Sequence, residues 1–541
     1  MDHLSGLDAT FLYMETPETP MHVGGLNIYE LPPGYEGDFL DNLREHIAQR
    51  MHLAPVFRRK LVNMPFELAN PIWVLDEDLD MEYHIRSTVL PKPGTRAQLD
   101  KLVGRLHSSL LDRSRPLWEF FVIEGLESPP GAPAGTKHVA FYSKVHHAAL
   151  DGAAGVALAT AIMDISPIAR HVRPAPRRPS MSTDNFGIAE LAAAGVKNSA
   201  IQALKMAKTL PTLVRTGFRM LRPKSTPKVV DVGNHDMGVA EKTSWFAPKT
   251  PINVSITNQR SFSSFSVSMA ELKQVAKGNG VTLNDVVMGI CSGALRHYLA
   301  DLNCRPEMPL LAGVPVSLRE EGNTDMNTQA SMMRISLASH IKDPLERLQA
   351  IRKASASAKA TTASFKSVMP MDFPSLGAPW LLSGLASLLG RSRLANSMPP
   401  IANVAISNVP GPRQALYMAG AKMLTYYPVS IVAHSLGLNV TVQSYNGNLD
   451  FGLIACRKAM PDLPELAKYM VQAHQELIRL TPKSGVEDAV AKPAPEPVTS
   501  PVVKPVTRPV AKPAPKRIAK PVLKVAAKTT AKRKGRAKPV A

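Results

Sequence analysis

The stretch Lys144-Val-His-His-Ala-Ala-Leu-Asp-Gly152 decides how the first half of the chain folds. It joins an alternating run at residues 137–145, which predicts a strand, to an alanine-rich run at 152–164, which predicts a helix. Consecutive strand residues point to opposite faces, so His146 and His147 do not easily share one metal ion. We therefore expect no metal site here.

Two interpretations stay open on these residues alone. A neutral imidazole at a strand end can act as a general base, because its ordinary pKa of about 6.5 lies close to neutral pH. Asp151 would then hold the loop, and Gly152 would let a substrate or a neighbouring backbone approach. Alternatively, His146 and His147 form a structural pair and Asp151 caps the following helix.

The order of expected elements predicts two mixed domains, at residues 1–180 and 251–481. The first contains strands at 22–31 and 137–145 and a helix at 39–51. The second contains a helix at 281–299, a strand at 310–318, and a hairpin over 436–455 that turns on Asn446-Gly447. We predict an α/β (α+β) fold, with a cleft between the two domains as the default place for a site.

A basic connector at 181–250 separates these domains. Eight Lys or Arg and no acid lie between Glu190 and Asp231, among apolar residues at near-helical spacing. A basic amphipathic helix pair of this kind suits a membrane surface. A solvated crossover between the domains is the equal alternative.

Most of the formal charge of +20 belongs to the end of the chain. Residues 491–541 carry ten Lys and four Arg against the single acid Glu496, which is 14 − 1 = +13 and leaves +7 for the rest. The segment 482–541 is rich in Lys, Pro and Ala and has no aromatic residue, so we expect disorder. It suits non-specific nucleic acid or another acidic partner such as anionic lipid, or a solubilising tether.

Other features exclude whole classes of protein. Cys291, Cys304 and Cys456 are scattered, which argues against a disulfide framework or a zinc cluster. The N-terminus has acids where a secretion signal needs positive charge. The longest apolar helix candidate, 379–390, has about half the length that a membrane span needs.

Several stretches together resemble one protein family. His-His-x-x-x-Asp-Gly is typical of the CoA-dependent acyltransferase superfamily, and "LSGLDATFLYMETPETPMHVGGL", "RSRPLWEFFVIEGL", "TLNDVVMGICSGALRHYL", "GVPVSLR", "ISNVPGP" and "SYNGNLDFGLIA" match one branch of it. Residues 1–480 resemble the bacterial wax ester synthase/diacylglycerol acyltransferase family. The resemblance implies two chloramphenicol-acetyltransferase-like mixed-sheet domains joined by a helical connector, with the active site at their interface.

The resemblance also implies roles for the motif residues. His147 would be the general base for direct attack, without an acyl-enzyme, and His146 would orient the loop. Asp151 would pair with Arg58 or Arg59, and Gly152 would support the motif.

Further positions follow from the other matched stretches. Asn284 is a candidate oxyanion donor, unless it merely caps its helix. Glu15 matches a position near the active-site cleft, and Pro116, Leu117 and Trp118 match an element suited to the wall of a lipid tunnel. Gly447 is a turn glycine to which we give a weaker substrate-channel role.

The implied reaction transfers a long-chain acyl group from acyl-CoA, as co-substrate, to diacylglycerol, to a fatty alcohol, or to both, with no permanently bound cofactor. Both acceptors are amphiphilic, so we expect a cytoplasmic protein on membranes or lipid droplets, docked through the basic connector and the stretch at 379–390. Acylation of another hydroxyl-bearing metabolite is one alternative. An inactive lipid-inclusion scaffold with a DNA-binding tail is the other.

Overall fold

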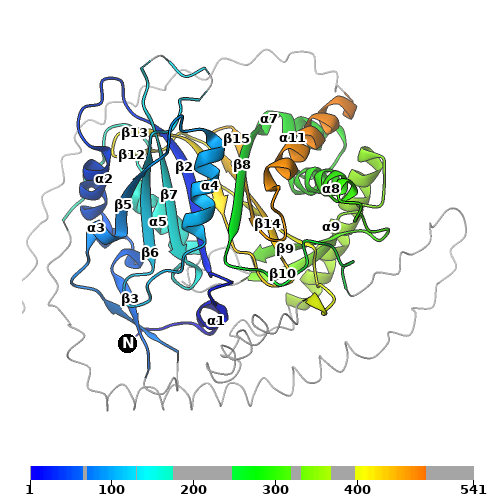
Figure 1. The fold of residues 1–541 in the computed structure, drawn as a ribbon, viewed down its shortest axis with the longest axis horizontal. Coiled ribbons are helices and arrows are strands. Elements are labelled where there is room, and N and C mark those ends of the chain that lie inside the picture. The colour runs from blue at the N-terminus through cyan, green and yellow to red at the C-terminus, as the bar shows by residue number, and fades with distance from the viewer. Residues whose placement is uncertain are drawn as a thin grey trace, which may run out of the picture. The chain divides into compact units, whose positions relative to one another are not determined.

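A computed structural model gives the fold of the chain (Figure 1). It describes residues 2–64, 70–129, 131–133, 135–150, 152–174, 246–317, 330–366 and 396–482. Most of the predicted connector, Asp151, the apolar stretch 379–390 and the tail beyond residue 482 lie outside these ranges. What the sequence predicts for those segments stays a prediction.

The first sheet contains β2 (His22–Glu30), β5 (Ile85–Val89), β6 (Trp118–Glu124), β7 (His138–His146), β12 (Tyr417–Met418) and β13 (Ala421–Val429). Its order is β12-β13-β2-β7-β6-β5, and only the pair β5–β6 is parallel. The strands predicted at 22–31 and 137–145 are thus confirmed as β2 and β7. Because β7 lies inside the sheet, nearly all its side chains are buried.

The second sheet contains β8 (Arg260–Ser268), β9 (Leu311–Ser317), β10 (Ala330–Ser336), β11 (Val404–Val409), β14 (Leu438–Tyr445) and β15 (Asn448–Cys456). Its order is β10-β9-β11-β14-β15-β8, with β11 parallel to both neighbours. The predicted hairpin is confirmed: Asn446 and Gly447 have φ values of 43° and 87°, as a tight two-residue turn requires. The mixed α/β class is therefore correct.

The sheets do not follow the expected domain boundary. β12 and β13 come from the range assigned to the second domain, yet β13 pairs with β2 of the first sheet over Val429↔Gly24 to Lys422↔Glu30. β13 also lies against β15, where a Cβ on Gly452 would stand 1.7 Å from the carbonyl oxygen of Pro428. The two sheets are joined by this exchanged strand, which chain order could not reveal.

Helices and short elements cover the sheets. The helices of the first half are α1 (Gly6–Met14), α2 (Phe39–Ala48), α3 (Met81–His84), α4 (Arg96–His107) and α5 (Gly152–Ile162), with 3-10 turns η1 (Met51–Leu53), η2 (Pro55–Phe57) and η4 (His147–Ala149). A small sheet of β1 (Asp2–His3), β4 (Ile72–Leu75) and β3 (Arg59–Val62) completes it. The second half has α7 (Met269–Gly278), α8 (Leu283–Asp301), α9 (Pro344–Lys366) and α11 (Leu463–Leu480), which lie together beside its sheet (Figure 1).

Local sequence explains where two of these helices begin. Asp38 caps α2, as its carboxylate accepts the Leu40 N–H. Thr282 caps α8, and Asp285 completes a capping box by accepting the Thr282 N–H at 2.9 Å. Among the described helices, none combines the length and apolar character that a membrane crossing needs.

Candidate active site

The histidine pair stands where β7 runs out into η4. The His146 N–H donates to the Leu117 carbonyl at 2.9 Å, and the His147 N–H donates to the Met21 carbonyl at 2.8 Å. Two different segments of the chain thus hold the backbone at two successive residues. His146 ends β7 and His147 begins η4, and the two imidazoles contact different side chains, Glu15 and Phe11.

His146 is fixed as a structural group. Its side chain is fully buried, and its Nδ1 accepts the Ala148 N–H at 3.0 Å. An accepting Nδ1 leaves the ring proton on Nε2, and that atom lies 3.2 Å from Oε2 of Glu15. These contacts allow His146 to hold the loop, and its role in the reaction stays a prediction.

Glu15 is the buried acid that braces this loop. Its side chain is only 2% exposed at the end of α1, and Oε1 accepts from Nη2 and Nε of Arg113 at 2.8 and 3.1 Å. Oε2 accepts the Met21 N–H at 3.0 Å. Burial alone would raise the pKa of Glu15, but contacts with His146, Arg113 and the Met21 N–H outweigh it and lower the pKa to about 2. Glu15 is thus an anion near neutral pH.

His147 has a different environment, which keeps its imidazole neutral. Its ring stacks on Phe11 of α1, with centroids 3.9 Å apart and planes inclined by 17°. Burial, helped by the nearby His146, lowers the pKa of His147 to about 4. Within the described residues, its Nδ1 has no hydrogen-bond partner. The ring is therefore neutral at pH 7, the state that a general base requires.

The rest of the motif is only partly described. Gly152 opens α5, so the helix starts at the end of the motif. Arg58 follows η2 and Arg59 opens β3, but Asp151 is not among the described residues. The predicted Asp151–arginine pair therefore stays a prediction.

Pro116, Leu117 and Trp118 have packing roles. Leu117 is fully buried beside Ala148 and offers its carbonyl to His146. Trp118 is also fully buried: it stacks on His84 at 4.3 Å, and its Nε1–H donates to the Phe57 carbonyl. The Leu117 carbonyl thus supports the loop, and the tunnel-wall role that the resemblance implied stays a prediction.

Asn284 and Gly447 belong to the second half. Asn284 does not cap its helix, because Thr282 does. It is exposed, and its Oδ1 accepts from Nδ2 of Asn408, which leaves its own amide hydrogens for another acceptor. Gly447 lies in the exposed hairpin turn, where an added Cβ would meet no other atom within 4 Å, so turn geometry explains it.

A buried ion pair next to the site has no counterpart among the sequence predictions. Lys144 lies directly opposite Glu119 across β6 and β7, with Nζ 2.8 Å from Oε2. Both side chains are buried, and Arg86 contacts the other carboxylate oxygen at 2.9 Å. Phe11 and Arg113 were missed too, although both lie in stretches that the resemblance uses. Their roles depend on contacts between distant segments.

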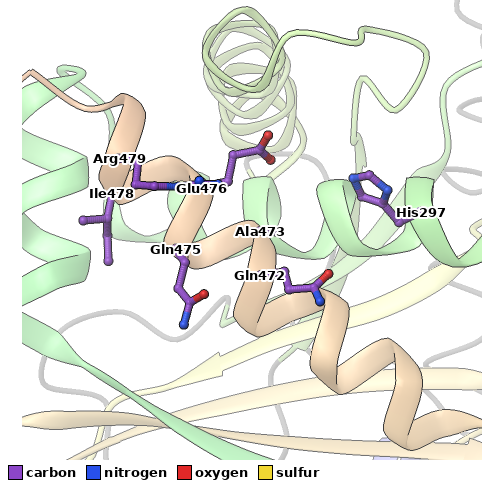
Figure 2. A pocket seen from close by; sticks show the side chains of 7 residues that line it. All are labelled: His297, Gln472, Ala473, Gln475, Glu476, Ile478 and Arg479. Atoms are coloured by element: carbon purple, nitrogen blue, oxygen red, sulfur yellow. The ribbon is translucent and has the colours of Figure 1, made fainter.

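A surface cavity of about 600 Å³ lies elsewhere, between α8 and α11 (Figure 2). It is lined by His297, Gln472, Ala473, Gln475, Glu476, Ile478 and Arg479. None of these residues belongs to the histidine loop, the segment from His146 to Leu150. The candidate site is therefore identified by its side chains and not by this cavity. In the part of the chain that the structure describes, no three His, Cys, Asp or Glu side chains gather in a way that could hold a metal ion.

Comparisons with known proteins identify the family of the chain. The family model for the wax ester synthase/diacylglycerol acyltransferase catalytic domain matches residues 4–287, and the model for the corresponding C-terminal domain matches residues 327–478. A probable diacylglycerol O-acyltransferase of Mycobacterium tuberculosis is 33% identical over 484 residues, covering 88% of this chain and 99% of that protein. A second diacylglycerol O-acyltransferase from the same species, named as putative, is 35% identical over 483 residues, covering 88% and 90%.

Two solved structures are similar to this chain. The wax ester synthase/diacylglycerol acyltransferase from Marinobacter aquaeolei VT8 superposes with a TM-score of 0.61 at 31% identity, covering 88% of this chain and 98% of that one. The TRI3 trichothecene 15-O-acetyltransferase from Fusarium sporotrichioides has a TM-score of 0.51 at 12% identity, covering 88% and 94%. The second likeness shows the fold alone.

Proposed function

The chain belongs to the wax ester synthase/diacylglycerol acyltransferase family, and from this membership we propose that it transfers a long-chain acyl group from acyl-CoA to a diacylglycerol, a fatty alcohol, or both. The names of the mycobacterial relatives favour diacylglycerol, and the name of the Marinobacter enzyme covers both acceptors. Within this chain, the neutral ring of His147 at the end of β7 carries the proposal.

The proposed reaction is a direct acyl transfer. His147 takes the proton of the acceptor hydroxyl while that oxygen forms a bond to the thioester carbonyl carbon. The tetrahedral intermediate then breaks its C–S bond, and the CoA thiolate leaves and recovers the proton from the imidazolium. Positioned proton abstraction of this kind contributes roughly 10²–10⁴-fold.

The low pKa of His147 constrains this step. A ring with a pKa of about 4 is neutral at pH 7, but it is too weak a base to hold the alcohol proton before the alcohol reacts. Proton transfer must therefore accompany formation of the C–O bond. Glu15 does not relay the proton, because its contact is with His146 and not with His147.

Asn284 is the proposed donor to the oxyanion. Its amide hydrogens stay available because Asn408 occupies only its Oδ1. One such donor contributes about 3–4 kcal/mol to the stability of a tetrahedral transition state. This role requires the N-terminus of α8 to lie at the reacting carbonyl.

We also propose that the protein works at an anionic membrane surface or lipid droplet, because both acceptors are amphiphilic. The basic connector at 181–250 and the stretch 379–390 are the proposed contacts. Flotation with anionic liposomes tests this proposal: full-length protein should float, and chains lacking either segment should float less. Flotation of both deletion variants equal to that of the full chain would contradict it.

CoA release by the purified protein tests the reaction. We expect turnover of palmitoyl-CoA with a diacylglycerol, with hexadecanol, or with both, and a loss of about 100-fold or more in His147→Ala. The matched control is His297→Ala, since His297 is an exposed histidine on α8 outside the site. Full turnover in His147→Ala would refute the mechanism.

The acceptor panel also separates the alternatives. Turnover with another hydroxyl compound and with neither lipid would favour acylation of a different metabolite. No turnover with any acceptor, together with DNA binding lost on removal of residues 491–541, would favour the scaffold.

A further inference from the structure

The turn from Glu15 to Met21 supplies two supports of the histidine loop. Glu15 contacts His146, and the Met21 carbonyl accepts the His147 N–H. The turn is closed internally, since the Thr19 N–H donates to the Thr16 carbonyl at 2.9 Å and the two hydroxyls lie 2.8 Å apart. Any shift of this turn therefore moves the supports of both histidines.

Arg260 reaches this turn from the other half of the molecule. It opens β8 in the second sheet, and its Nη2 donates to the Glu18 carbonyl at 2.6 Å. Its Nη1 donates to the carbonyls of Thr257 and Gln259. One guanidinium thus joins the start of the second sheet to the middle of the 15–21 turn.

The surroundings hold Arg260 in place. The residue is 6% exposed, and its backbone N–H donates to Oγ of Ser108 at 3.2 Å. A Cβ on Gly104 would lie 2.8 Å from the Arg260 carbonyl oxygen, so α4 packs closely on this point. Burial lowers the pKa of Arg260 to about 10, which still leaves it charged at pH 7. A buried cation that donates to backbone carbonyls restricts their movement strongly.

We propose that Arg260 is a positioning residue for the acyl transfer: by holding the Glu18 carbonyl, it sets the 15–21 turn and thereby the alignment of His147. This inference rests on the proposed role of His147 as base. It gives the second half of the chain a direct part in aligning a histidine that the first half carries. A displacement of about 1 Å in such a group costs up to about 100-fold in rate.

Steady-state kinetics of Arg260→Met, with Arg347→Met as the matched control, tests the proposal. Arg347 is also buried and also donates to backbone carbonyls, those of Ile341 and Lys342, but it lies far along the chain from the turn. In Arg260→Met we expect kcat to fall at least about 10-fold, with KM for palmitoyl-CoA within about twofold. Arg347→Met should be less stable but keep its kcat.

The pH profile distinguishes positioning from general destabilisation. A loosened turn would admit water to the His147 ring, so the acid limb of kcat/KM should move up from about pH 4 toward the ordinary value of about 6.5. Among the described residues, His146 is the titratable neighbour that acts on this ring, and Glu15 contacts His146; neither variant replaces them. The limb should not move in Arg347→Met.

Arg260→Lys keeps a cation and covers the case in which Arg260→Met does not fold. Its single ammonium cannot bridge the Glu18 and Thr257 carbonyls as a guanidinium does, so we expect an intermediate kcat. The proposal is overturned if the folded Arg260 variant keeps wild-type kcat and an unmoved acid limb while His147→Ala is inactive. Full activity of His147→Ala would instead overturn the proposed function.

Discussion

Replacing Glu15 by Gln removes the buried charge that braces the histidine loop and keeps the shape of the side chain. The pKa of Glu15 falls from 4.5 to about 2 on folding, which corresponds to about 3.5 kcal/mol of folding free energy. Because the pKa is lower in the folded state, this stability is present above about pH 4.5 and is lost as the pH falls toward 2.

We expect Glu15→Gln to be less stable than wild type by about 1–3 kcal/mol at pH 7, because the amide stays beside His146 but no longer carries the charge that attracts Arg113. At about pH 3.5, roughly one unit below the unfolded pKa, the carboxylate has lost about 1.4 kcal/mol of its contribution, so the gap should shrink by that amount. Urea unfolding followed by tryptophan fluorescence at both pH values measures it.

Glu465→Gln is the matched control, because Glu465 forms an exposed pair with Lys468 at 2.7 Å on α11. Such a pair contributes no more than about 1 kcal/mol. A Glu15→Gln gap that is equal at both pH values would refute the assignment of the low pKa to this carboxylate. A gap no larger than that of Glu465→Gln would show that Arg113 contributes little.

Three further substitutions test other parts of the structure. Lys144→Met leaves the buried carboxylate of Glu119 with one partner fewer, so the free energy of unfolding should fall by about 3 kcal/mol, and adding Glu119→Leu should restore part of it; no change in urea unfolding would contradict this. Gly452→Ala places a methyl group against the Pro428 carbonyl, and the yield of soluble protein should collapse; a normal yield would refute that packing. Asn284→Ala should lower kcat about 100-fold without changing the unfolding midpoint, whereas unchanged kcat would remove Asn284 from the site.

Those elements whose formation depends on neighbouring residues could be predicted from the sequence. Alternation indicated β2 and β7, and Asn446-Gly447 indicated the hairpin, because each depends on neighbouring residues. The pattern also placed the histidines at the end of a strand. The alternative that Asn284 caps α8 was wrong, because Thr282, two positions earlier, caps this helix.

Contacts between distant segments were beyond prediction from one sequence. Glu15 and Arg113 are 98 positions apart, and neither stretch has a local signal for the pair. The rings that pack on Trp118 come from Phe57 and His84, and only the folded chain brings these segments together. Likewise, nothing local in residues 421–429 shows that they pair with β2.

The exchanged strand β13 has a consequence for the order in which the protein can be made. The edge of β2 stays uncovered until residue 429 has been synthesised, although β2 itself ends at residue 30. An uncovered strand edge is a template for pairing with other chains. During synthesis the first sheet therefore cannot be completed until β13 has left the ribosome. A fragment that ends at residue 250 lacks β13 and would leave this edge of β2 exposed.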